Sequence, residues 1–173
     1  NRHAGGKMVW RYPSALGQMG NLEVDLNFMY RIPLWPVQLK SSSIVGSKQV
    51  HNIPILDPHE LSAGKLAALI DRKTGRDLFD AYHLLTKTDL DMPKLRLALI
   101  VYSAISRKAD LRKLTPKAIS VDITDLNNRL LPLLRKSELS SMGRASTWAE
   151  NLTQACQKAF QHFLPLTENE HDF

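Results

Sequence analysis

Residues 57–85 constrain the fold of this chain most strongly, because they read as two amphipathic helices that meet at a sharp break. Asp57-Pro58 supplies an N-cap residue followed by a proline at the first helical position. Lys73-Thr74-Gly75 ends the first helix, with the glycine where a left-handed C-cap is expected. The second helix begins at Arg76 or Asp77, and its apolar stripe consists of Leu78, Ala81, Tyr82 and Leu85. The pattern predicts a helical hairpin.

The polar residues around this break are candidates for binding an anionic ligand. At 100° per residue, Lys65 and Arg72 fall within about 20° of each other and roughly 10 Å apart along the first helix. Asp77 and Asp80 share a face of the second helix away from its apolar side, and Arg76 can reach Asp80 at i+4. Lysine and arginine suit phosphate, and carboxylates can orient bases or accept hydroxyl groups. The alternative is that these residues are surface ion pairs and helix-dipole partners.

The first third of the chain predicts strands. Residues 22–30 alternate apolar and polar side chains, which is typical of a half-buried strand, and Glu23, Asp25 and Asn27 share the face opposite the core. Residues 7–12 and 49–56 read as two further strands, and the segment 40–47 reads as a flexible connection.

After residue 57 the sequence predicts helices only. Beyond the helical hairpin, these cover residues 93–106, 115–136 with an interruption at Pro132, and 146–164. Residues 165–173 are polar and are expected to be a disordered tail. The predicted fold class is α+β, divided into a strand region at 1–56, a helical region at 57–164 and the tail.

Composition narrows the functional classes. The net charge of +6 favours nucleic acid or an acidic protein as a partner, and cations recur between residues 94 and 117 as a candidate phosphate-binding surface or a solvated face. The single cysteine, Cys156, excludes an intrachain disulfide, and the sequence predicts it to be a small buried residue. No stretch reaches the roughly 20 apolar residues that a membrane span needs, so no membrane partner is expected.

The polar residues of the break form a recognisable motif. Lys65-x-x-Ala68-Leu69-x-x-Arg72-x-x-x-Arg76-Asp77-x-x-Asp80 resembles the signature of the AbiEii/AbiGii toxins. These are nucleotidyltransferase-like proteins of bacterial abortive-infection and type IV toxin–antitoxin systems. Upstream, Leu22-Glu-Val-Asp25-Leu-Asn-Phe28 resembles the family's strand that carries a single carboxylate. The resemblance covers about residues 7–86 and implies a partial mixed β-sheet of a nucleotidyltransferase-like core, followed by a C-terminal helical bundle.

The resemblance also implies a reaction and roles for individual residues. A nucleotide would be transferred from a nucleoside triphosphate to an acceptor, which could be tRNA, in the bacterial cytoplasm, and a cognate antitoxin would counter the toxin. Asp25 would hold Mg²⁺ and would act with Asp80 in catalysis. The nucleotide-binding residues would be Lys65, Arg72, Arg76 and Asp77.

The sequence departs from the family pattern before Asp25. In nucleotidyltransferases, a Gly-Ser turn followed by a pair of carboxylates precedes this strand, and no residue before Asp25 supplies either feature. The chain begins with Asn1 rather than methionine, which favours a fragment of a longer enzyme over a degenerate member. We therefore expect this chain alone to be inactive. The alternative function is a non-catalytic nucleotide- or RNA-binding module.

Overall fold

The structure is a computed structural model that describes residues 5–14, 17–28, 32–105 and 110–171. These residues form two small antiparallel sheets and seven α-helices, so the predicted α+β class is confirmed. The chain divides into two compact units, residues 1–34 and residues 35–173. No helix among the described residues has the length and apolar character to cross a bilayer.

The first unit is a β-hairpin. Strand β1 (Gly5–Pro13) pairs with β2 (Met19–Asn27) in antiparallel register, with Lys7 opposite Asp25. The predicted alternation is present: one face carries the apolar side chains of Met8, Trp10, Tyr12, Leu22, Val24 and Leu26. Most of these side chains are exposed rather than half-buried, because a two-stranded hairpin has no second layer of its own to cover them.

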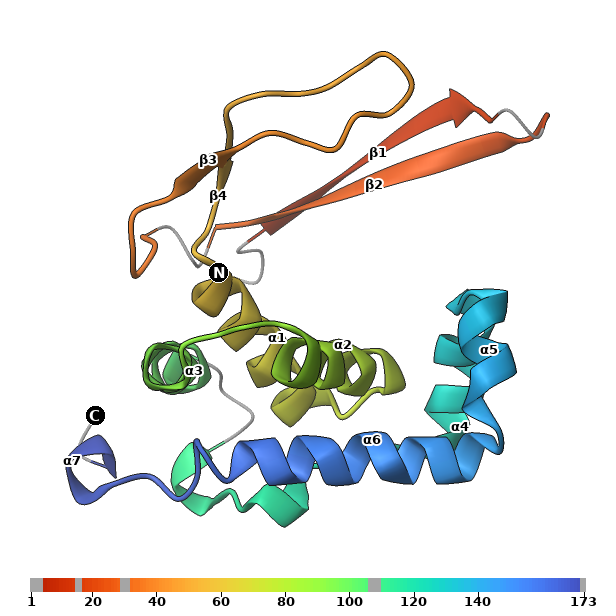
Figure 1. Cartoon of the computed structure of the whole chain (residues 1–173). Helices are drawn as coiled ribbons and strands as arrows, with labels where there is room; N and C mark the ends of the chain where they lie inside the picture. Colours follow the sequence, from red (N-terminus) through yellow and green to blue (C-terminus); the bar gives the residue numbers. More distant parts are fainter. Residues whose placement is uncertain (1–4, 15–16, 29–31, 106–109, 172–173) are drawn as a thin grey trace. The chain divides into compact units, whose positions relative to one another are not determined.

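The second unit begins with two short strands and continues as helices (Figure 1). Strand β3 (Gln38–Lys40) pairs with β4 (Ile53–Ile55) in antiparallel register. The long helices are α1 (Pro58–Arg72), α2 (Gly75–Lys87), α3 (Met92–Ile105) and α6 (Ala145–Phe160). The shorter ones are α4 (Ile123–Asp125), α5 (Lys136–Met142) and α7 (Glu168–His171). Single 3₁₀ or π turns are η1 (Leu111–Lys113), η2 (Pro116–Ala118), η3 (Leu126–Leu130) and η4 (Leu131–Leu133).

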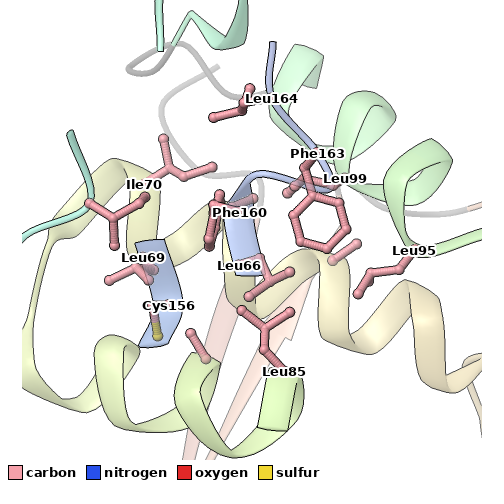
Figure 2. Packing of buried hydrophobic residues seen from close by; sticks show 14 of the residues in the cluster. Leu66, Leu69, Ile70, Leu85, Leu95, Leu99, Cys156, Phe160, Phe163 and Leu164 are labelled. Carbon is pink, nitrogen blue, oxygen red and sulfur yellow. The ribbon is translucent and has the colours of Figure 1, made fainter. Parts of the chain in front are cut away.

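The core of the second unit lies where α1, α2, α3 and α6 meet. Figure 2 shows buried leucines of α1 and α3 packed around Phe160 and Phe163, whose rings form an edge-to-face pair at 5.6 Å. Cys156 is buried in the same cluster, as the sequence predicts, and burial raises the pKa of its thiol to about 12. This packing holds α1 and α2 together as a helical hairpin.

The strand region before residue 57 differs from its predicted pattern. Residues 35–56 group with the helices, because Trp35 packs on the helical core and its ring lies 4.5 Å from the ammonium of Lys94. The predicted third strand shrinks to β4, and its partner β3 reaches into the segment predicted to be a flexible connection. The division into domains with separate roles stays a prediction.

The predicted break between α1 and α2 is confirmed, but its glycine serves another purpose. The left-handed cap is Lys73, with a φ of 53°, and Gly75 is the first residue of α2. Gly75 is buried, and a Cβ atom there would lie 2.8 Å from the Cα of Leu126. Thus close approach of η3, rather than a left-handed backbone, requires the glycine.

The helix predicted over residues 115–136 is wrong. The chain forms η2, α4, η3 and η4 there in place of one helix, and α5 begins at Lys136. Pro116 and Pro132 each lie in the first turn of a 3₁₀ segment, where a proline is tolerated but cannot continue a preceding helix. The result is an irregular segment that packs on the helical hairpin through the buried side chains of Leu126 and Leu130.

The disordered tail predicted for residues 165–173 is also wrong over the described residues 165–171. Glu168–His171 is helical, and Arg96 of α3 forms a two-pronged ion pair with Glu170, at 2.8 and 2.6 Å. The same guanidinium donates to the carbonyls of His162 and Pro165. One partly buried arginine thus donates to four acceptors and holds this segment against α3.

Candidate functional site

Two of the predicted site residues form an ion pair across the helical hairpin. The ammonium of Lys65 on α1 donates to a carboxylate oxygen of Asp80 on α2 at 2.8 Å. The two side chains are 56% and 40% exposed, so solvent reaches both. Spacing alone suggested Arg76 as the partner of Asp80, whereas the structure pairs Asp80 with Lys65. Arg76 itself is exposed.

The other pair lies at the break itself. Arg72 donates to both carboxylate oxygens of Asp77, at 3.0 and 2.5 Å, and the hydroxyl of Thr74 donates to the same carboxylate at 2.7 Å. The hydrogen bonds to Asp77 raise the pKa of the Arg72 guanidinium. The sequence placed Asp77 on a face away from the apolar side, but its side chain is only 5% exposed. Its oxygens are used within the fold, and the three side chains together hold the break.

A pocket of about 700 Å³ opens beside the Lys65–Asp80 pair. Helix α1 contributes Leu61, Ser62 and Lys65, and α2 contributes Phe79, Asp80, His83 and Leu84. The opposite wall comes from the end of η4 and from α5, through Leu133, Leu134, Arg135 and Glu138. Apolar walls with a few charged groups are typical of small-molecule sites. This pocket can therefore hold a flat apolar group and a neighbouring anion.

Several pocket residues were not predicted from the sequence. His83 follows Asp80 by three residues, so helical spacing alone would have placed it on the same face. Its ring packs edge-on against Phe79 at 4.4 Å. Arg135 and Glu138 had no comparable signal, because Arg135 lies in the segment wrongly predicted to be one helix and no element was predicted at Glu138. Only tertiary packing brings that segment to the hairpin.

A hydrogen bond between distant residues anchors the segment that leads to the opposite wall. The backbone N–H of Gly75, the first residue of α2, donates to a carboxylate oxygen of Asp125 at 2.7 Å. Asp125 precedes η3, and its carboxylate also lies 3.4 Å from Arg129. The bond satisfies a helix N-terminal donor that has no partner within α2. It ties the break to the segment that leads to the pocket wall.

Asp25 lies in the first unit, on the polar face of β2. Lys7 on β1 forms an ion pair with Glu23 at 2.8 Å and lies 3.8 Å from Asp25, whose side chain is 77% exposed. The hydrogen bond to Glu23 and the charge of Asp25 raise the pKa of Lys7. Lys65 and Asp80 belong to the second unit, so a site shared between Asp25 and these residues stays a prediction.

Most of the cations that the structure describes between residues 94 and 117 lie in ion pairs. The described pairs are Lys94 with Asp57 at 2.7 Å, Arg96 with Glu170 at 2.6 Å, Arg112 with Asp110 at 2.8 Å, and Lys113 with Asp110 at 3.9 Å. Arg107 and Lys108 lie outside the described residues, and Lys117 is exposed. Most of the described cations in this region are therefore already paired with carboxylates of the chain, which weakens the case for a phosphate-binding surface there.

The comparison with protein families decides the class of this chain. The sequence matches the family described as nucleotidyl transferase AbiEii toxin, type IV TA system, over residues 1–170. The chain belongs to this family. The match extends well beyond residues 7–86, where the motifs were recognised, and it includes the segment that forms the opposite wall of the pocket. Comparisons with curated proteins and with solved structures found no match.

Membership of the AbiEii family raises the question of a divalent metal, because nucleotidyl transfer uses one to neutralise phosphoryl charge. Over the ranges that the structure describes, no three histidine, cysteine or acidic side chains come together as metal ligands. Beside Asp25 the second carboxylate is Glu23, and Lys7 lies between the two. The described donor set therefore does not assemble a metal centre by itself.

Proposed function

We propose that this chain supplies the nucleotide-binding part of an AbiEii-type nucleotidyltransferase, which transfers a nucleotide from a nucleoside triphosphate to an acceptor such as tRNA. The observation that carries the proposal is the pocket beside Lys65 and Asp80, in a chain of the AbiEii family. In this proposal the protein acts in the bacterial cytoplasm. The type IV toxin–antitoxin family implies an antitoxin as its partner.

Different pocket residues would contact different parts of the nucleotide. On ligand binding, the ion pair between Lys65 and Asp80 would break, and Lys65 would bind a phosphate as a compact positive charge. Asp80 would then face the ligand and accept a proton from a hydroxyl group. Leu61, Leu84 and Phe79 offer an apolar wall for the base. Lys65 is thus the phosphate contact and Asp80 the catalytic candidate of the pocket.

The remaining predicted residues take supporting roles. Arg72 and Asp77 hold the break that presents α1 and α2 to the ligand, and Arg76 stays an exposed cation next to them. Asp25 remains the proposed ligand of Mg²⁺, because its strand resembles the family's strand that carries a single carboxylate. The chain as described would depend on further carboxylates to complete such a centre.

The proposal is tested on the protein as the gene encodes it. We expect Lys65→Ala and Asp80→Ala to abolish incorporation of a labelled nucleotide into RNA and to relieve growth inhibition in the host. The matched control is Lys87→Ala, which removes an exposed lysine from the last turn of α2 outside the pocket. Wild-type incorporation by Lys65→Ala would refute the catalytic proposal.

The second candidate function is a non-catalytic nucleotide- or RNA-binding module. It is favoured by the donor set around Asp25, which does not form a metal centre within the described residues, and by the net charge of +6. This candidate predicts that nucleotide binding depends on Lys65 while incorporation is absent from the wild type. If RNA binds through phosphate contacts, its affinity should fall steeply as salt is raised.

A further inference from the structure

The opposite wall of the pocket presents a cation that is not used by the fold. Arg135 lies between η4 and α5 and lines the pocket together with Leu133, Leu134 and Glu138. Its side chain is exposed and makes no ion pair or hydrogen bond with any residue in the described part of the chain. Lys65, in contrast, is already bound to Asp80 at 2.8 Å. Arg135 is thus the cation of this pocket that is available to a ligand at no cost to the fold.

The segment that leads to Arg135 is anchored on the helical hairpin. Asp125 accepts a hydrogen bond from the N–H of Gly75 at 2.7 Å, and Leu126 and Leu130 are buried against the helical hairpin. These contacts lie within ten residues of Arg135 in the sequence. A binding group on an anchored segment loses less conformational freedom when a ligand binds.

We propose that Arg135 is a phosphate-binding residue of this pocket, which grips a phosphate group from the wall opposite Lys65. The proposal rests on the proposed nucleotide site and adds a residue to it. A guanidinium presents paired donors that match two phosphate oxygens, so Arg135 sets the position of the phosphate, and Lys65 adds a point charge from the other side. The apolar side chains that line the rest of the pocket then receive the base. The phosphate belongs to a nucleoside triphosphate or to the backbone of an RNA acceptor.

The test measures binding by isothermal titration calorimetry. Its variants are Arg135→Ala, Arg135→Lys and the control Lys136→Ala, which removes the neighbouring exposed cation outside the pocket lining. The probes are each of the four ribonucleoside triphosphates, the corresponding nucleosides, inorganic tripolyphosphate and a single-stranded RNA oligonucleotide. Thermal unfolding of each variant confirms that it is folded.

We expect Arg135→Ala to weaken triphosphate and tripolyphosphate binding by about tenfold or more, since a charge-assisted hydrogen bond is lost. Nucleoside binding should not change. The affinity of Arg135→Lys for triphosphate and tripolyphosphate should lie between those of Arg135→Ala and the wild type, and Lys136→Ala should bind every probe as the wild type does. A loss of RNA binding alone would support Arg135 as a phosphate ligand and would refute the triphosphate site. The inference is overturned if Arg135→Ala weakens no phosphate probe more than Lys136→Ala does, or if the wild type binds none of these probes.

Discussion

Lys65 and Asp80, fifteen residues apart in the sequence, form an ion pair of 2.8 Å that joins α1 to α2 at the edge of the pocket. The pair neutralises the lysine that the proposed function requires for phosphate. A ligand must therefore displace Asp80 from Lys65, and part of its binding energy is spent on breaking the pair. Because both side chains are partly exposed, that cost is small, about 0.2–1 kcal/mol.

Asp80→Asn should release Lys65 for phosphate. We expect this variant to bind tripolyphosphate up to about fivefold more tightly, since the competing carboxylate charge is gone. Nucleotide incorporation should nevertheless be lost, because the amide cannot act as a base. Asp89→Asn, at an exposed aspartate between α2 and α3, is the control for the change in net charge. Weaker tripolyphosphate binding by Asp80→Asn would show that the pair does not compete with the ligand.

Gly75→Ala should destabilise the second unit. The new Cβ atom would lie 2.8 Å from the Cα of Leu126, and we expect a loss of about 1–3 kcal/mol from this overlap. Gly64→Ala is the control inside α1, where the added atom meets the ring of Tyr102 at an ordinary 3.5 Å. That change should be neutral or stabilising by up to about 1 kcal/mol. Urea unfolding measures both, and equal stability of the two variants would contradict the proposed close approach.

The stability of the fold at acid pH should depend on Asp57, the N-cap of α1. Burial would raise the pKa of this carboxyl, but hydrogen bonds from Lys94 and His59 outweigh burial and lower the pKa from 3.8 to about 2. Because the folded pKa lies below the unfolded one, the stabilisation is complete above about pH 4 and is lost as the pH falls towards 2. Asp57→Asn should reduce the slope of the urea midpoint between pH 4 and pH 2. An unchanged slope would contradict this account.

Glu170 should hold residues 165–171 in place. The ion pair with Arg96 lowers the pKa of Glu170 to about 2, so the pair is fully formed near neutral pH. We expect Glu170→Gln to speed hydrogen exchange in this segment while leaving α6 unchanged. Glu168→Gln, on the same short helix, is the control and should have no effect. The pair would be unnecessary for the order of the segment if Glu170→Gln exchanged at the wild-type rate.

The sequence predicts the parts of this fold that local patterns determine. The N-cap at Asp57, the break after Lys73 and the buried stripe of Leu78 and Leu85 are all local, and each is confirmed. The prediction of one helix over residues 115–136 was wrong because the chain there forms several short turns. Pro116 and Pro132 each lie in the first turn of such a segment. The docking of residues 165–171 depends on Arg96, about seventy residues earlier, and no local pattern reveals such a partner.

The site residues also divide into those that a local pattern identifies and those that only tertiary packing brings to the pocket. The motif identified Lys65 and Asp80 by their spacing, and the pocket contains both of them. Asp77 has the same spacing signal but is buried, because Arg72 and Thr74 bind it from the preceding turn. Arg135 lines the pocket because its segment folds back on the helical hairpin, where the bond between Gly75 and Asp125 joins positions fifty residues apart. A helical wheel contains no information about such a contact.

The most direct measurement is a crystal structure of the protein with a non-hydrolysable nucleoside triphosphate. The account predicts a triphosphate within hydrogen-bond distance of Lys65, the Lys65–Asp80 pair broken, and the base against Phe79 and Leu84. A nucleotide bound elsewhere on the molecule, with Lys65 still paired to Asp80 at 2.8 Å, would contradict it.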